Sequence, residues 1–161
     1  MIQAFQPLKL PLIIAGTGPL ENEFRLAAEK SPHIRFVGFQ SGKALEELYQ
    51  GAYACVLPSE WNENLSMVGI EALTYGKPVI GSRIGGIPEL IRDGFNGRLF
   101  EPFSVDDLRE KVVALRNLPL GDYERLCRNA QESTRHRFSL DYHYEELMKV
   151  YQKALRDPEE G

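Results

Sequence analysis

The segment that organises the chain runs from Pro58 to Ile80 and reads PSEWNENLSMVGIEALTYGKPVI. Its pattern predicts the end of a strand, a polar loop, a helix that begins near Asn64, and a second strand. Gly76 and Pro78 mark the end of the helix, because glycine adopts the left-handed conformation cheaply and proline cannot continue the helical hydrogen bonds. The segment therefore predicts a strand–helix–strand unit.

Two glutamates bracket the predicted start of this helix. Glu63 lies at the junction of loop and helix and Glu71 about two turns further on, roughly 12 Å away along a continuous helix axis. The amides of Asn64, Leu65 and Ser66 would form a helix N-terminus, which attracts phosphate groups. A sugar diphosphate joined to a nucleoside has about this length. The same spacing also fits a first-turn acid that the helix dipole favours, followed by a solvated glutamate.

The rest of the chain alternates between apolar runs and helical patterns. Strands are expected at Leu10–Ala15, Ile34–Phe39, Tyr53–Leu57, Pro78–Ser82 and Arg98–Phe100. Such alternation is typical of a doubly wound, Rossmann-like α/β fold, in which a parallel sheet has helices on both faces.

The C-terminal third is predicted to be helical. Ser104 carries a capping signature, and Ser139 precedes a last helix with an apolar stripe that includes Tyr144 and Leu155. Taken alone, this stripe favours packing on the domain's own sheet. We expect one domain over residues 1–156 and a disordered tail at 157–161.

At two glycine-rich turns a ligand or a neighbouring segment could approach the backbone closely. Gly16-Thr17-Gly18 follows an apolar strand, where a phosphate can approach the backbone, but Glu21 replaces the third glycine of the dinucleotide fingerprint. A plain tight turn and a dinucleotide site of the oxidoreductase type therefore remain as alternatives there. The pair Gly85-Gly86 indicates contact with a ligand or with a neighbouring strand.

Composition restricts the classes of partner. The net charge of -4 gives no electrostatic reason to expect nucleic acid. Cys55 and Cys127 lie in apolar patterns and are interpreted as reduced core residues of a cytoplasmic protein. His33, His136 and His143 lack metal-ligand spacing, and no Asp-x-Asp pair occurs, so no catalytic metal is expected. No cofactor is expected either.

A family resemblance narrows these expectations. The run from Pro58 to Glu89 is similar to the C-terminal, nucleotide-sugar-binding half of retaining glycosyltransferases with the GT-B fold, and especially to their family four. Glu63 and Glu71 reproduce the Glu-x7-Glu motif that marks this family. The resemblance implies that the chain is one half of a GT-B fold.

The resemblance also implies roles for particular residues. Glu63 would be the catalytic residue that binds the sugar hydroxyls, and Glu71 would bind the ribose. The amides of Asn64, Leu65 and Ser66 would hold the diphosphate. The loop at Gly38, Phe39 and Gln40 would border the base, next to Gly16 and Gly18. Asn64 and Leu65 replace the Phe-Gly that is common after the first glutamate, so the hexose and the base, as in a UDP- or GDP-hexose, stay open.

Family members carry parts that precede this stretch. These are an N-terminal acceptor-binding domain, through which the protein would associate with membranes, and a first strand whose loop supplies an Arg and a Lys to the diphosphate. Without these cations the affinity for the donor should fall by at least about 1.5 to 3 kcal/mol. The isolated chain is expected to be inactive, and a non-catalytic nucleotide-binding or regulatory module of the same fold is the alternative function.

The strand that precedes this stretch in the family would be central in the sheet. It would lie between Leu12–Ala15 and Tyr53–Leu57, so its absence would leave backbone groups unpaired. We therefore expect the chain to self-associate through this gap.

Overall fold

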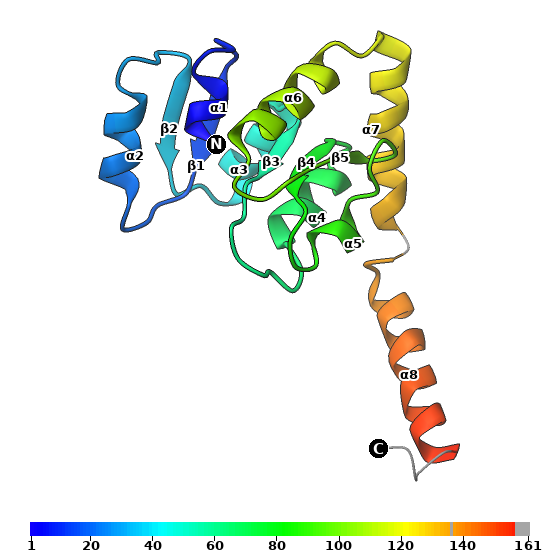
Figure 1. Ribbon diagram of the computed structural model, residues 1–161. Coiled ribbons are helices and arrows are strands. Elements are labelled where there is room, and N and C mark those ends of the chain that lie inside the picture. The colour runs from blue at the N-terminus through cyan, green and yellow to red at the C-terminus, as the bar shows by residue number, and fades with distance from the viewer. Residues whose placement is uncertain (136, 157–161) are drawn as a thin grey trace.

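The computed structural model describes residues 1–135 and 137–156 (Figure 1). The expected tail at 157–161 and His136 lie outside the described residues. The strands are β1 (Leu12–Ala15), β2 (Ile34–Gly38), β3 (Cys55–Leu57), β4 (Val79–Ser82) and β5 (Gly97–Phe100). The helices are α1 (Ile2–Phe5), α2 (Glu21–Ala28), α3 (Gly42–Gly51), α4 (Met67–Thr74), α5 (Ile87–Leu90), α6 (Val105–Arg116), α7 (Leu120–Arg135) and α8 (Leu140–Arg156).

The strands form a parallel sheet that is divided in two. β1 pairs with β2, and β3, β4 and β5 pair in that order, all in parallel. Within the described residues, β1 has no partner other than β2, and β3 has none other than β4. The α/β prediction is confirmed, and the division lies between β1 and β3, where the family resemblance implied a further strand.

Helices cover both faces of the larger sheet piece. Successive residues of β4 point to opposite faces, so that Ile80 packs in one core cluster and Val79 in the other. The first cluster includes buried side chains of α1, α2 and α6, whereas the second includes side chains of α3, α4 and α5. α7 contributes Leu126 to the first cluster and Ala130 to the second.

Helix α1 links the two pieces of the sheet. Ile2 and Phe5 belong to the same core cluster as Leu12 of β1 and Ile80 of β4. The apolar core is therefore continuous although the strand ladder is not. The opposite face of β1 lacks such cover, because Ile13 keeps 48% of its surface exposed.

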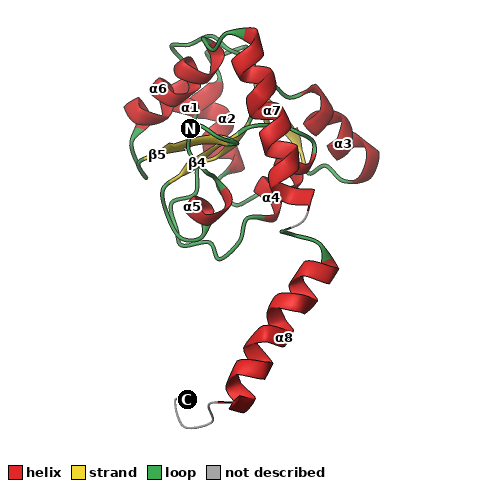
Figure 2. Ribbon diagram, turned by 90° about the vertical axis from the view of Figure 1, so that its right-hand side faces the viewer, coloured by secondary structure: helices red, strands yellow, loops and turns green. Residues whose placement is uncertain are grey.

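The last helix departs from the expectation that it packs on the domain's own sheet. α8 has no buried residue and extends away from the body of the domain, as Figures 1 and 2 show. Leu155 in its apolar stripe is 82% exposed. The stripe is regular, but the described residues provide no surface that covers it. No helix of the described residues is both long and apolar enough to cross a membrane.

The divided sheet leads to a prediction about association. Because β1 and β3 each present an unpaired edge, two copies can gain backbone hydrogen bonds by pairing these edges. We expect light scattering to give a molar mass that rises with concentration above the 18.3 kDa of one chain.

A charge on the edge strand should reduce this association. Ile13→Lys is expected to shift the mass toward that of one chain, because lysine on an edge strand opposes strand addition. Leu26→Lys changes an equally apolar side chain on α2 that is 70% exposed, and it serves as the control. A strictly monomeric mass for the unmodified chain at all concentrations would count against the prediction.

Candidate functional site

The carboxyl ends of the strands define the candidate site. In a parallel sheet these ends lie along one edge, where ligands of open α/β folds bind. Gly16 follows β1, Gly38 ends β2, and Glu63 lies in the loop that follows β3. Each of the loops that the sequence singled out therefore leaves the sheet at the same edge.

Helix α4 begins later than the sequence predicted. Its first residue is Met67, and Ser66 is the N-cap, whose hydroxyl accepts from the amide of Gly69 at 3.4 Å. Asn64 and Leu65 therefore belong to the loop and not to the helix. The estimate of about 12 Å between the two acids assumed a continuous helix from Asn64, so it no longer applies.

The backbone between the two acids keeps a run of free donors. The amides of residues 64–68 donate no hydrogen bond to any described residue. Asn64 and Leu65 supply two of these amides from the loop, and Met67 supplies one from the first turn of α4. Unpaired amides at and before a helix N-terminus favour an anion, because the helix dipole adds to their partial positive charges.

Glu63 is held by two serines. The hydroxyl of Ser59 donates a short hydrogen bond to Oε1 of Glu63. Ser59 is fixed in turn, because the hydroxyl of Ser82, a fully buried residue at the end of β4, donates to its carbonyl at 2.7 Å. The side chain of Glu63 is thus connected to the central strand of the larger sheet piece.

The glycine pair after β4 contacts the backbone of the loop that carries Glu63. The amide of Gly86 donates to the carbonyl of Glu63 at 2.7 Å. A Cβ atom on Gly86 would lie 1.9 Å from the carbonyl oxygen of Asn64, and one on Gly85 would lie 2.5 Å from that of Glu63. The close approach that Gly85-Gly86 indicated in the sequence is therefore made by the backbone of the loop that carries Glu63.

Glu71 is oriented from the neighbouring helix. It lies half-buried on α4, and the hydroxyl of Tyr49 in α3 donates to its Oε2 at 2.9 Å. The ring of Tyr49 stacks on that of Tyr75, with centroids 5.4 Å apart and planes 10° from parallel. Burial, and then the hydrogen bond to Glu71, raise the pKa of Tyr49 above its ordinary value.

The turns after β1 and β2 meet each other. The amide of Gly16 donates to the carbonyl of Gly38 at 2.7 Å, and both residues have positive φ angles, 126° and 71°. Phe39 is 73% exposed, and the side-chain amide of Gln40 donates to the carbonyl of Val37 at 2.6 Å. Gly18 lies on the exposed part of the turn after β1.

The structure places the predicted site residues in three separate pairs of contacting residues. Glu63 lies beside Gly86, Glu71 beside Tyr49, and Gly16 beside Gly38. Among the described residues, no hydrogen bond or ion pair joins Glu63 to Glu71. Within ranges 1–135 and 137–156, no three His, Cys, Asp or Glu residues form a group that could hold a metal ion. Both cysteines are free thiols.

Three positioning contacts were not assigned from the sequence. Ser59 and Ser82 belong to the stretch that resembles the family, but no local pattern links either of them to Glu63. Tyr49 repeats with the apolar face of its helix, which indicates a core residue and does not reveal its hydroxyl contact. Contacts of this kind depend on how separate elements meet in space.

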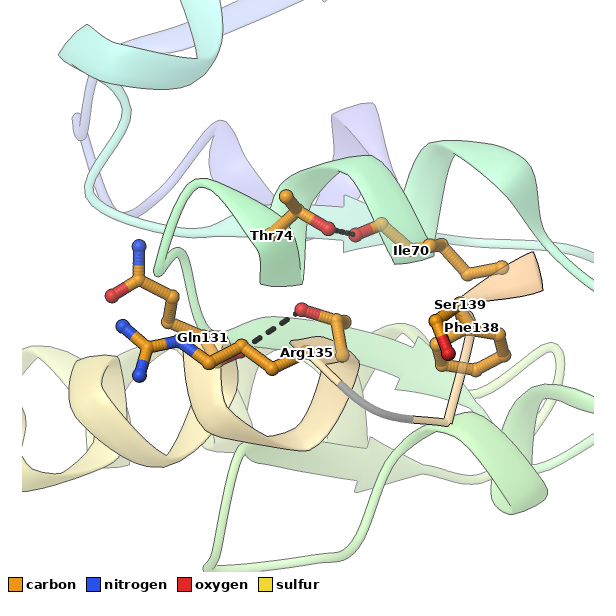
Figure 3. A pocket seen from close by; sticks show the side chains of 7 residues that line it. Ile70, Thr74, Gln131, Arg135, Phe138 and Ser139 are labelled. Atoms are coloured by element: carbon orange, nitrogen blue, oxygen red, sulfur yellow. Dashed lines mark hydrogen bonds between the residues drawn. The ribbon is translucent and has the colours of Figure 1, made fainter. Parts of the chain in front are cut away.

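A hollow of about 350 Å³ lies elsewhere, between α4 and the end of α7. Figure 3 shows Thr74 and Ile70 of α4 on one side of it, with Gln131 and Arg135 of α7 on the other. None of the residues that line it is a predicted site residue, and none is acidic. This hollow is therefore separate from the candidate site, which is an open edge of the sheet.

Comparisons with known proteins identify the family of the chain. Residues 1–137 match the family model of glycosyl transferases group 1. The chain is 31% identical over 119 residues to an uncharacterized glycosyltransferase of Methanocaldococcus jannaschii, which covers 73% of this chain and 34% of that protein. It is 34% identical over 121 residues to a D-inositol 3-phosphate glycosyltransferase of Actinosynnema mirum, with 75% of this chain and 28% of that protein covered.

Solved structures share the fold. A glycosyltransferase of Rickettsia africae superposes with a TM-score of 0.81 at 20% identity, over 97% of this chain and 44% of that one. Anabaena HepE in complex with UDP-glucose gives a TM-score of 0.79 at 21% identity, over 94% of this chain and 44% of HepE. The C-terminal domain of a group 1 glycosyl transferase from Francisella tularensis gives a TM-score of 0.68 at 18% identity, over 86% of this chain and 92% of that domain.

The extent of these matches is consistent across the relatives. The chain spans about a third of the length of the curated relatives it matches. The family model covers most of the chain, including both glutamates and every strand. This match argues against the alternative of a dinucleotide-binding domain of the oxidoreductase type. The chain belongs to the family of group 1 glycosyl transferases.

Proposed function

We propose that the chain is the donor-binding half of a retaining glycosyltransferase that transfers a hexose from a nucleotide-activated sugar. The observation that carries this proposal is the run of free amides at 64–68, which lies between two acids that hydroxyl donors orient. An anion site between two carboxylates suits a ligand with a central diphosphate and a hydroxyl-bearing group at each end.

Each part of the site has a proposed task. Glu63 accepts hydrogen bonds from the hydroxyls of the donor sugar, and the amides of residues 64–68 hold the diphosphate. Glu71 accepts from the ribose hydroxyls, and the loop at Gly38 to Gln40, with Gly16 and Gly18, borders the base. The amides act most strongly when charge develops on the leaving diphosphate, so they favour the transition state over the bound donor.

The reaction is proposed to need no metal ion and no cofactor. The leaving group is stabilised by fixed donors, and orientation of the sugar by Glu63 supplies the second contribution. Asn64 and Leu65 are exposed beside Glu63, so the loop that contacts the sugar is open to solvent. The hexose is therefore selected by contacts that form only when the other half of the enzyme covers this loop.

The other half of the enzyme is proposed to close the site. Trp61, which precedes the free amides, and Met67, which carries one of them, are 71% and 62% exposed. The apolar stripe of α8 is also exposed, which suits a helix that packs on an N-terminal acceptor-binding domain. The isolated chain is proposed to bind the donor without transferring its sugar.

Donor binding can be tested by removing one acid. We expect saturation-transfer NMR to show binding of one compound among UDP-glucose, GDP-mannose and ADP-glucose, in preference to NAD. Glu71→Ala should weaken that binding roughly 10- to 100-fold, because it removes a charged hydrogen-bond acceptor for the ribose.

The matched control is Glu47→Ala, which removes an exposed acid from the solvent side of α3. This variant should bind like the unmodified chain. A preference for NAD, or equal binding by the Glu71→Ala variant, would contradict the proposed donor site.

The support of the Glu63 loop can be tested at Gly86. Gly86→Ala places a methyl group against the carbonyl of Asn64, so the loop must move. We expect the free energy of unfolding to fall by about 1 to 3 kcal/mol and donor affinity to fall roughly tenfold. Denaturant unfolding and the same NMR experiment measure the two effects.

Gly51→Ala in α3 is the control, because a Cβ atom there meets no heavy atom within 4 Å. Its donor affinity should not change. If Gly86→Ala binds the donor as well as the unmodified chain, the loop does not depend on this contact.

A further inference from the structure

The side chain of Glu71 has one committed oxygen and one free oxygen. Its Oε2 accepts from the hydroxyl of Tyr49 at 2.9 Å. Among the described residues, no group donates a hydrogen bond to Oε1. Glu71 is half-buried on α4, so the free oxygen stays accessible while the other is held.

Tyr49 is itself fixed in place. Only 8% of its surface is exposed, and its ring stacks on that of Tyr75. Beside it, Nζ of Lys77 donates to the carbonyl of Gln50 at 2.8 Å and so ties the end of α3 to the segment after α4. The hydroxyl of Tyr49 therefore reaches Glu71 from a rigid position.

A held carboxylate binds a diol better than a mobile one. A glutamate on a helix surface rotates about three side-chain bonds, and this freedom is lost when a ligand orders the carboxylate. The hydrogen bond from Tyr49 orders Oε2 before any ligand arrives and still leaves lone pairs for two ribose hydroxyls. Because burial and the contact with Glu71 raise the pKa of Tyr49, its hydroxyl remains a donor at neutral and mildly alkaline pH.

From these contacts we infer that Tyr49 is a positioning residue for Glu71, an inference that rests on the proposed role of Glu71 in binding the donor's ribose. Tyr49 acts through the carboxylate and does not itself touch the sugar or the phosphates. Its contribution therefore appears only with ligands that carry ribose hydroxyls.

The substitution Tyr49→Phe separates this role from a structural one. Phenylalanine retains the ring that stacks on Tyr75, and it removes only the hydroxyl that contacts Glu71. Tyr53→Phe is the matched control, because it removes a hydroxyl that donates at 3.4 Å to the carbonyl of Leu115, on the other face of the sheet.

Affinities should be measured by ligand-observed NMR for UDP, GDP and ADP, each beside its 2′,3′-dideoxy analogue. The unmodified chain should bind one ribonucleotide more tightly than its dideoxy form. Tyr49→Phe should weaken binding of that ribonucleotide about 5- to 20-fold and leave the dideoxy form unchanged. Tyr53→Phe should change neither.

The outcomes separate this inference from the proposed function. If Tyr49→Phe weakens both nucleotide forms equally, or neither, Tyr49 does not position Glu71 for ribose and the inference is overturned. If the unmodified chain binds no nucleotide, or binds both forms equally, the ribose-binding role of Glu71 is wrong and the inference falls with it.

A ligand-free measurement tests the contact itself. A spectrophotometric titration of the unmodified chain and of Tyr49→Phe identifies the ionisation of Tyr49 as the step that the variant lacks. This step should occur at higher pH than in an ordinary tyrosine. Glu71→Ala should move that ionisation to lower pH, because the hydrogen bond and the nearby carboxylate both favour the protonated phenol. An unchanged titration in Glu71→Ala would overturn the inference whatever the nucleotides do.

Discussion

The candidate site depends on the contact between two loops that leave neighbouring strands. The backbone of Gly86, after β4, packs against Glu63 and Asn64, after β3, with no room for a side chain between them. The hydrogen bond from Gly86 to Glu63 adds to the one between Ser82 and Ser59. Because β3 and β4 are paired in the sheet, this contact transmits the rigidity of the core to a loop that is otherwise exposed.

The two acids are held by the same device from different directions. A neutral hydroxyl donates to one carboxylate oxygen, with Ser59 acting on Glu63 and Tyr49 acting on Glu71, and no other described residue donates to the second oxygen. A lysine or arginine in either place would bind the acid more strongly, but it would compete with the ligand for the carboxylate. Neutral donors fix the geometry of the acids and preserve their capacity to accept hydroxyl groups.

The sequence was sufficient for the order and type of the elements, but not for contacts between distant segments. Apolar runs predicted the strands, and Ser104 is the N-cap of α6 as expected. The start of α4 was placed too early, because Asn64 and Ser66 are both favourable N-caps and only tertiary packing decides between them. The hydrogen bond from Tyr49 to Glu71 joins residues 22 positions apart, for which no local pattern exists.

The periodicity of α8 shows a second limit of sequence reasoning. An apolar stripe establishes that one face of a helix avoids water, but it does not identify the covering surface. Packing on the domain's own sheet was the simplest expectation, and the structure instead leaves the stripe exposed. The stripe has the same character whether the covering surface belongs to this domain or to another.

The open form of the site follows from its position at the edge of one domain. Asn64, Leu65, Met67 and Val68 are exposed, so a diphosphate bound to the amides at 64–68 as proposed would remain in contact with water. Water weakens the attraction between amide dipoles and phosphate, whereas a covering surface lowers the local dielectric constant and strengthens it. Sites between two domains gain both enclosure and additional donors in this way. Trp61 precedes these amides and Met67 carries one of them, and both side chains are exposed, so a second domain that packed over them would exclude water from the amides.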